Sequence, residues 1–129
     1  MDHIVLNMID EEKMIAFYTE VLLCTPERLE EYRAGEVPFP SVRLNEDTVI
    51  DLFPKTMWGN DAPNGQGHVN LNHFCIAVSK ESWDELAERL AANAIDIVDG
   101  PDRRWGAHGV GTSIYFRDPE ANLIEARYY

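Results

Sequence analysis

The stretch from Arg104 to Tyr129, RWGAHGVGTSIYFRDPEANLIEARYY, constrains the fold more than any other part of the chain. Its pattern predicts a glycine-broken loop, a strand, a tight turn and a final strand. Alternation in the final strand puts Leu123, Glu125 and Arg127 on one face of the strand. The other face carries Asn122, Ile124, Ala126 and Tyr128. A carboxylate therefore lies mid-strand among apolar neighbours. Because an unpaired buried carboxylate is costly, Glu125 must be protonated, salt-bridged or bound to a metal.

Length and charge restrict the class of protein. The chain has 129 residues, 45% of them hydrophobic, which is enough for one domain over residues 1–129 or for two half-size modules that share a core. Its net charge is -12, and no basic cluster offsets it, so nucleic acid and anionic membranes are poor partners. The start of the chain lacks a signal-peptide pattern, so we expect a cytoplasmic protein whose two cysteines stay reduced.

The order of predicted elements repeats once along the chain. Residues 1–54 are predicted to form strands at 3–8, 28–33, 39–44 and 48–53, with a helix capped by Asp10 after the first strand. Residues 55–70 are rich in Pro, Gly and Asn, which is typical of a linker. Residues 71–129 then give strands at 71–78, 95–98, 112–116 and 122–128, with a helix at 82–92. Both modules therefore have the order β-α-β-β-β.

Each predicted module opens on a strand histidine and closes on a strand carboxylate. The pairs are His3 with Asp51 and His73 with Glu125, and their separations are similar, 51 minus 3 being 48 and 125 minus 73 being 52. If the two sheets curl around one cavity, His3, His73 and Glu125 can converge there. Asp51 would then be a fourth ligand or an outer group.

This set of residues points to a catalytic metal site. Two imidazoles and one carboxylate with open positions suit one divalent ion of Fe, Mn, Ni, Co or Zn. Each residue also has a simpler interpretation. A strand histidine is often only hydrogen-bonded, Glu125 could pair with Arg127 or Arg117, and Asp51 could be a solvated carboxylate near Lys55.

The chain resembles the vicinal oxygen chelate superfamily, which contains glyoxalases, fosfomycin resistance proteins and extradiol dioxygenases. The stretches that carry the resemblance are His3 with AFYTEVLL, VIDLFP, NHFCIAV and the ending RWGAHGVGTSIYFRDPEANLIEARYY. The resemblance implies an α+β fold in which two βαβββ modules form a cupped mixed sheet around a divalent metal. It implies His3, His73 and Glu125 as ligands, and it places Asp51 where glyoxalase I enzymes have a glutamate.

The chain also departs from the family pattern. Asp51 is one methylene shorter than glutamate, so a water-bridged role is as reasonable as direct ligation. Leu23 and Ala121 stand where the family commonly has glycine, and Ala121 must avoid or tolerate a positive φ.

Two further residues are candidates for catalysis. In related enzymes a tyrosine at the place of Tyr115 faces the substrate, where its phenol could donate to an anionic oxygen; otherwise Tyr115 is a core residue bonded to backbone. Arg104 could bind an anionic substrate group through its guanidinium, or it could pair with a surface acid. Cys75, next but one to His73, could line the cavity as a thiol or serve as a small buried hydrophobic residue.

The leading functional hypothesis is a metal-dependent enzyme that acts on a small chelating substrate through an enolate or oxyanion. Its class is a lyase or isomerase, a dioxygenase or a thiol transferase. Ring cleavage is disfavoured because extradiol dioxygenases carry an extra pair of modules. The alternatives are a fosfomycin-type thiol transferase and a metal-free, bleomycin resistance-like drug-binding protein, which the charge of -12 would suit. The resemblance also implies a homodimer.

Overall fold

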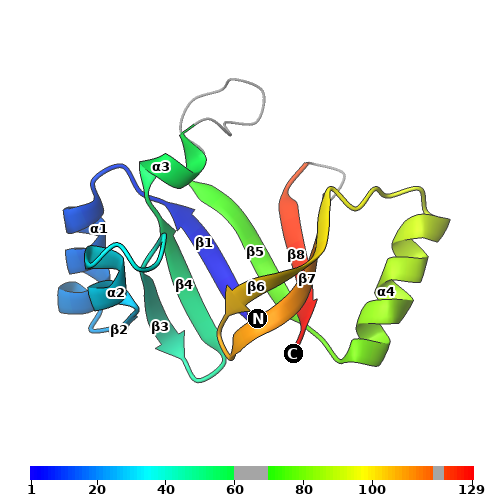
Figure 1. Cartoon of the computed structure of the whole chain (residues 1–129), viewed down its shortest axis with the longest axis horizontal. Helices are drawn as coiled ribbons and strands as arrows, with labels where there is room; N and C mark the ends of the chain where they lie inside the picture. Colours follow the sequence, from blue (N-terminus) through cyan, green and yellow to red (C-terminus); the bar gives the residue numbers. More distant parts are fainter. Residues whose placement is uncertain (60–69, 118–120) are drawn as a thin grey trace. The chain divides into compact units, whose positions relative to one another are not determined.

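The computed structural model describes residues 1–59, 70–117 and 121–129. Figure 1 shows the helices and strands in chain order: β1 (His3–Asn7), α1 (Glu11–Ala16), the π-helical turn η1 (Phe17–Val21), β2 (Thr25–Glu27), α2 (Leu29–Arg33), β3 (Ser41–Asn45), β4 (Thr48–Phe53), α3 (Lys55–Trp58), β5 (Leu71–Ala77), α4 (Lys80–Ala92), β6 (Asp99–Gly106), β7 (Gly109–Arg117) and β8 (Leu123–Tyr128). Apart from the short helices α2 and α3, the order β-α-β-β-β occurs twice, as predicted.

The chain forms two compact units. The first unit is Ile4–Asn72, and the second unit is Met1–His3 together with His73–Tyr129. The first residue of β1, His3, therefore belongs to the second unit. The predicted modules 1–54 and 71–129, with their linker, stay a prediction. In the part of the chain that the structure describes, no helix has both the length and the apolar character needed to cross a membrane.

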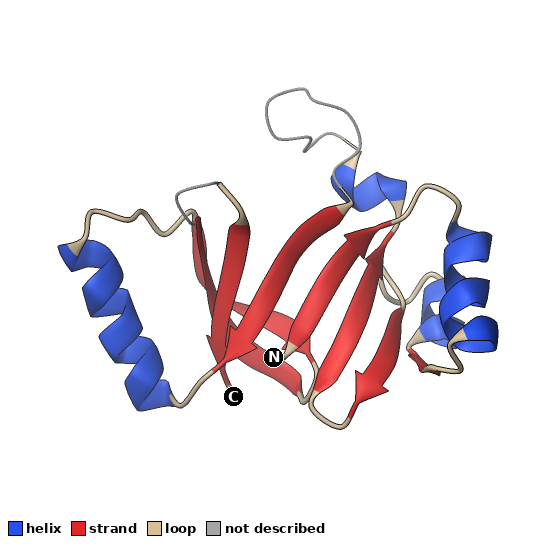
Figure 2. Ribbon diagram, turned by 180° about the vertical axis from the view of Figure 1, so that it is seen from behind, coloured by secondary structure: helices blue, strands red, loops and turns tan. Residues whose placement is uncertain are grey.

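Strand pairing makes the sheet mixed, and the predicted α+β class is confirmed. In the second unit the strand order is β5-β8-β7-β6, with β5 parallel to β8 and the other neighbours antiparallel. In the first unit β2, β3 and β4 pair antiparallel in that order. Figure 2 shows the strands in red and the helices in blue.

Helix α4 covers one face of the second unit's strands, beside β8 and β7 in Figure 1. It begins at Lys80, two residues before the predicted start, and is capped by Ser79, whose side chain accepts a hydrogen bond from the Ser82 amide. Its buried face packs on alternate strand residues, and the cluster comprises Trp83, Leu90, Ile114, Phe116 and Ala126. The Trp83 indole also donates to the Ala126 carbonyl at 2.9 Å. Because strand side chains alternate, Tyr115 and Glu125 must point to the opposite face.

The first unit has its own apolar core. Helix α1 starts at Asp10, whose carboxylate accepts from the Lys13 amide, as the sequence predicted. The buried cluster consists of Met8, Ile15, Val42, Ile50 and Leu52. This core holds β4, and with it Asp51, in place within the first unit.

The predicted strand at residues 28–33 is wrong. Leu29–Arg33 is the helix α2, and it follows Arg28, whose φ of 57° lies in the left-handed region. Leu, Glu and Arg favour helix, and Glu30 and Glu31 suit the positive end of its dipole. The neighbouring strand is instead the short β2, which pairs with β3.

The predicted strand at residues 95–98 is also wrong, because β6 lies further along, at Asp99–Gly106. Its partner β7 begins at Gly109, inside the stretch predicted to be a glycine loop, and pairs with β6 from there to Tyr115, within the predicted strand at 112–116. Arg104 therefore lies in a strand rather than in a loop. β6 is the last strand in the strand order, and charged residues on such an edge strand protect it from pairing with other chains. Because these residues are charged, the segment shows no apolar alternation from which a strand could be predicted.

Leu23 ends the first helical segment with a φ of 55°, and Ala121 has a φ of 68°. Both occupy the left-handed conformation that the family glycines would favour, so Ala121 tolerates the positive φ rather than avoiding it. Side-chain sterics penalise this conformation in L-residues, whereas glycine adopts it freely. Leu23 is 79% exposed, so its side chain contributes little packing.

We expect Leu23→Gly to raise the free energy of unfolding by about 0.5–1 kcal/mol, since relief of left-handed strain exceeds the added chain entropy. The matched control is Leu22→Gly. Leu22 has a φ of -86°, so the same change there should lower stability by about 0.5–1 kcal/mol. Urea unfolding of both variants measures the difference. If both variants changed the free energy of unfolding by the same amount in the same direction, left-handed strain at Leu23 would not explain the result.

Candidate metal centre

Three residues of the second unit, each on a different strand, are the predicted ligands. His3 is the first residue of β1, His73 lies on β5, and Glu125 lies on β8. All three side chains are buried, with exposed fractions of 2%, 6% and 0%. The parallel pairing of β5 with β8 sets Cys75 opposite Glu125, which puts His73 within reach of the same carboxylate.

Three side-chain atoms form a small triangle. The distance from His3 Nε2 to Glu125 Oε2 is 2.9 Å, from His73 Nε2 to the same oxygen 3.2 Å, and between the two Nε2 atoms 3.3 Å. A point outside the plane of this triangle can lie about 2.1 Å from every corner, which is the usual distance from a first-row metal to nitrogen or oxygen ligands. The donor set and its geometry therefore fit a divalent ion bound by three ligands on one side, with the remaining positions open.

Glu125 is held by other donors as well. The Ser113 hydroxyl donates to Oε1 at 2.5 Å, the Tyr115 hydroxyl donates to Oε2 at 2.8 Å, and Arg127 Nη1 lies 3.7 Å from Oε1. Burial raises the pKa of this carboxyl, but the hydrogen bonds from His3, His73 and Ser113 outweigh it and hold the pKa far below its usual range. Glu125 is therefore an anion, which is the form that binds a cation.

His3 carries the proton that balances this anion. Burial lowers its pKa, but contacts with Asp2, Cys75 and Glu125 raise it to about 12. The imidazolium proton thus lies where a metal would bind, so metal binding must displace it.

Arg127 supplies a second buried cation and is fully shielded from solvent. Its guanidinium donates to the carbonyls of Trp105 at 2.7 Å and Arg104 at 2.5 Å. Gly106 makes this close approach possible, because a Cβ at that position would lie 1.9 Å from Arg127 Nη1. The sequence interpretation that paired Glu125 with Arg127 therefore describes one part of a larger network.

The other predicted residues lie in different surroundings. Arg104 binds Asp99 at 3.0 Å and Asp102 at 2.6 Å, which is the surface pairing considered as its alternative. Asp51 belongs to the first unit, where it is 2% exposed and accepts from Ser41 Oγ at 2.5 Å, so the interpretation of Asp51 as a solvated carboxylate is wrong.

Cys75 is fully buried, and burial raises its pKa to about 12, which keeps it a thiol. The Tyr115 hydroxyl donates to the Glu125 carboxylate, and among the residues that the structure describes this is the hydrogen bond given for its side chain.

Sequence reasoning missed three contributors to the site: Asp2, Ser113 and Tyr129. Ser113 shares the strand face of Tyr115, so the alternation that located Tyr115 could have located it too. Asp2 directly precedes His3, but a neighbour in sequence normally points to the other face of a strand. Tyr129 lay outside the predicted final strand, and no sequence pattern marked it.

A buried cluster of two histidines and one carboxylate on an α+β fold with repeated β-α-β-β-β order defines a candidate mononuclear metal centre. The model of the glyoxalase/bleomycin resistance protein/dioxygenase superfamily matches residues 1–126. The chain therefore belongs to this superfamily, and the resemblance seen in its motifs is confirmed.

Several individual proteins are similar to this chain. Virulence protein STM3117 of Salmonella typhimurium is 35% identical over 130 residues, covering 100% of this chain and 83% of that protein. The glyoxalase domain-containing protein RDO1 of Mycosarcoma maydis is 30% identical, covering 100% and 68%. Among solved structures, the Mn(II)-bound glyoxalase from Novosphingobium aromaticivorans is 25% identical with a TM-score of 0.70; the match covers 98% of this chain and 36% of that one.

Proposed function

We propose that this protein is a divalent-metal-dependent enzyme acting on a small substrate that chelates the metal through two adjacent oxygens. The observation that carries the proposal is the buried triangle of His3 Nε2, His73 Nε2 and Glu125 Oε2, with sides between 2.9 and 3.3 Å. One ion of Fe, Mn, Ni, Co or Zn suits this donor set. The Mn(II) in the similar glyoxalase from Novosphingobium aromaticivorans supports the same assignment.

When bound, the metal would act as a Lewis acid that stabilises negative charge on the substrate's oxygens. The protein's own residues prepare the site for this chemistry. Ser113 holds one oxygen of Glu125 and so orients the carboxylate toward both histidines. Tyr115 lies against His73, with ring centroids 5.3 Å apart, and its hydroxyl is within the same cluster.

Tyr115 is the proposed catalytic donor. Burial and the neighbouring Glu125 charge raise the pKa of its phenol well above the usual range, so the hydroxyl keeps its proton. That proton is donated to Glu125 Oε2 in this structure, and in the proposed mechanism the hydroxyl turns it to a substrate oxygen bound next to Glu125. Such a donor stabilises an enolate or oxyanion as charge develops. Arg104 is a weaker candidate, because its guanidinium is already paired with Asp99 and Asp102. We propose that the working form is a homodimer.

The test is a panel of substrates with protein stripped of metal and reloaded with Mn(II), Fe(II), Ni(II), Co(II) or Zn(II). The substrates are a glutathione hemithioacetal of an α-ketoaldehyde, a catechol with oxygen, and fosfomycin with a thiol. We expect one pairing of metal and substrate to turn over. Tyr115→Phe should lower its kcat about 100-fold, the usual cost of losing one oxyanion donor.

Tyr115 also donates to the proposed ligand Glu125, so Tyr115→Phe should weaken metal binding as well. The control is therefore to compare kcat of both proteins at saturating metal, where a difference in metal affinity no longer contributes. Metal-loaded protein that turns over no substrate, but binds bleomycin at micromolar concentration without metal, would overturn the enzyme proposal. The drug-binding alternative would then lead.

A further inference from the structure

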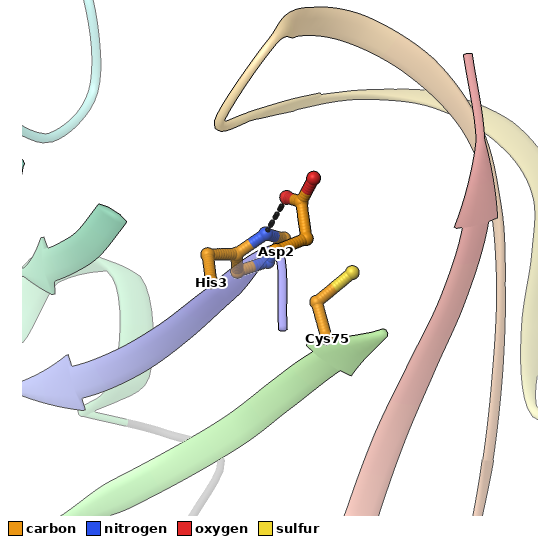
Figure 3. A group of neighbouring side chains, drawn as sticks. All are labelled: Asp2, His3 and Cys75. Atoms are coloured by element: carbon orange, nitrogen blue, oxygen red, sulfur yellow. Dashed lines mark hydrogen bonds and ion pairs between the residues drawn. The ribbon is translucent and has the colours of Figure 1, made fainter. Parts of the chain in front are cut away.

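Asp2 is a buried carboxylate at the edge of the candidate metal centre. Its side chain is fully shielded, and its backbone amide donates to the Cys75 carbonyl at 3.0 Å, which fixes it beside β5. Figure 3 shows the Asp2 carboxylate against the His3 ring, with Cys75 next to both; the dashed line is the contact from His3 Nδ1 to Asp2 Oδ1, 2.7 Å long. This contact uses the ring nitrogen that does not face Glu125.

Four donors surround the Asp2 carboxylate. Besides His3, the Tyr129 hydroxyl donates to Oδ2 at 2.5 Å, the Ala107 amide donates to Oδ1 at 3.2 Å, and Arg127 Nη1 lies 3.5 Å from Oδ1. These contacts fix the orientation of the Asp2 carboxylate next to the His3 ring.

The same surroundings argue against a second metal site at Asp2, His3 and Cys75, although their potential ligand atoms lie within 4.8 Å of one another. The oxygens of Asp2 already accept from protein donors. A further cation would also lie next to the Arg127 guanidinium, in a region where charge is poorly screened. Asp2 thus faces His3 as an acceptor rather than as a ligand.

We propose that Asp2 is the positioning residue of the metal centre: it holds the Nδ1 proton of His3 and thereby presents Nε2 to the metal. The inference rests on the metal site of the proposed function and deepens it. A histidine ligand whose second nitrogen donates to a carboxylate has a fixed tautomer and ring orientation and is a stronger ligand. Asp2 therefore sets the metal affinity without touching the metal.

Tyr129 extends this arrangement to the turn between β6 and β7. Its hydroxyl accepts from the His108 amide at 3.0 Å while donating to Asp2, and its ring lies 4.8 Å from the Arg127 guanidinium carbon. Removing the Tyr129 hydroxyl deletes one of the four Asp2 donors and leaves the ring. Tyr129→Phe should therefore disturb the contact between Asp2 and His3 less than replacement of Asp2 itself.

The test measures the dissociation constants of Mn(II) and Zn(II) for the metal-free full chain by competition with a chelating indicator. We expect Asp2→Asn to weaken binding 10- to 100-fold and Tyr129→Phe to weaken it by a smaller factor. Asp10→Asn is the matched control, because Asp10 is an exposed helix cap in the first unit. The affinity of this variant for both metals should equal that of the unmodified protein.

Nitrogen-15 spectra of the Zn(II)-loaded protein separate positioning from a merely structural role. In the unmodified protein His3 should show metal at Nε2 and a strongly hydrogen-bonded proton at Nδ1, and in Asp2→Asn that proton signal should move upfield or broaden. Dissociation constants of Asp2→Asn and Tyr129→Phe within twofold of the unmodified value would overturn this inference alone. Unmodified protein that binds neither metal would overturn the proposed function and this inference together.

Discussion

Replacing Glu125 by glutamine is expected to weaken the binding of a divalent metal by at least about 100-fold, because the loss of an outer-shell partner alone costs 10- to 100-fold and Glu125 is a proposed direct ligand. Glutamine keeps the volume of the side chain but removes its charge. The two histidines would then face a neutral amide at the point where their Nε2 atoms converge. His73→Ala should weaken metal binding to a similar extent, since it deletes another corner of the triangle.

The matched controls lie in the same unit. Glu88 is exposed on α4, and His108 is exposed in the turn after β6, so Glu88→Gln and His108→Ala should bind metal as the unmodified protein does. Metal content after dialysis, followed by competition titration, gives the affinities. If Glu125→Gln kept one equivalent of metal with an affinity within threefold of the unmodified protein, the ligand assignment would fail.

Arg127→Met is expected to lower the free energy of unfolding of the metal-free protein by about 3–5 kcal/mol, the usual cost of removing one partner from a buried ion pair. Arg127 is fully buried and lies 3.5 Å from Asp2 and 3.7 Å from Glu125. Methionine would leave both carboxylates without this cation. It would also leave the Arg104 and Trp105 carbonyls without their side-chain donor.

Arg117→Met is the control for this prediction. Arg117 lies on β7, is exposed, and donates only to the Ala121 carbonyl among the contacts that the structure gives for its side chain. Its replacement should change stability by less than about 0.5 kcal/mol, as surface substitutions usually do. Urea unfolding at neutral pH measures both variants. A loss below 1 kcal/mol for Arg127→Met would show that the buried charges are not coupled as described.

The double variant Arg127→Met with Asp2→Asn refines the test. If the two residues interact directly, removing the second should cost less once the first is gone, because Asp2 no longer carries an uncompensated charge. Additive losses would place the main role of Arg127 in its bonds to the Arg104 and Trp105 carbonyls.

Much of the site was predictable from strand alternation. Alternation put Glu125 on one face of β8 and Ala126 on the other, and the structure packs Ala126 under Trp83 while Glu125 meets His3 and His73. The repeated β-α-β-β-β order identified the histidines, because equivalent strands of a repeated unit place equivalent side chains alike. These inferences succeed because side-chain direction along a strand is a local property of the backbone.

The two wrong strand predictions concern segments whose local sequence pattern does not match the structure that they adopt. Residues 29–33 combine helix-forming side chains with turn signals around them, and only the pairing of β2 with β3 shows which segment is the strand. β6 carries charged residues on an edge, so it shows no apolar alternation, and its position is decided by its pairing with β7. Strand pairing between distant segments overrides the weak intrinsic preference of such sequences.

The sequence by itself determined the superfamily, the repeated order of elements and the three proposed ligands, because each follows from side-chain periodicity or from a motif that is contiguous in the chain. Only the tertiary structure decided the partners of the buried charges. Asp2 meets Tyr129 and Arg127, and Glu125 meets His3, across more than a hundred residues of chain. A buried charge is stabilised by the opposite charge or hydrogen-bond donor that the fold brings near it. The local order of residues does not specify which partner that is.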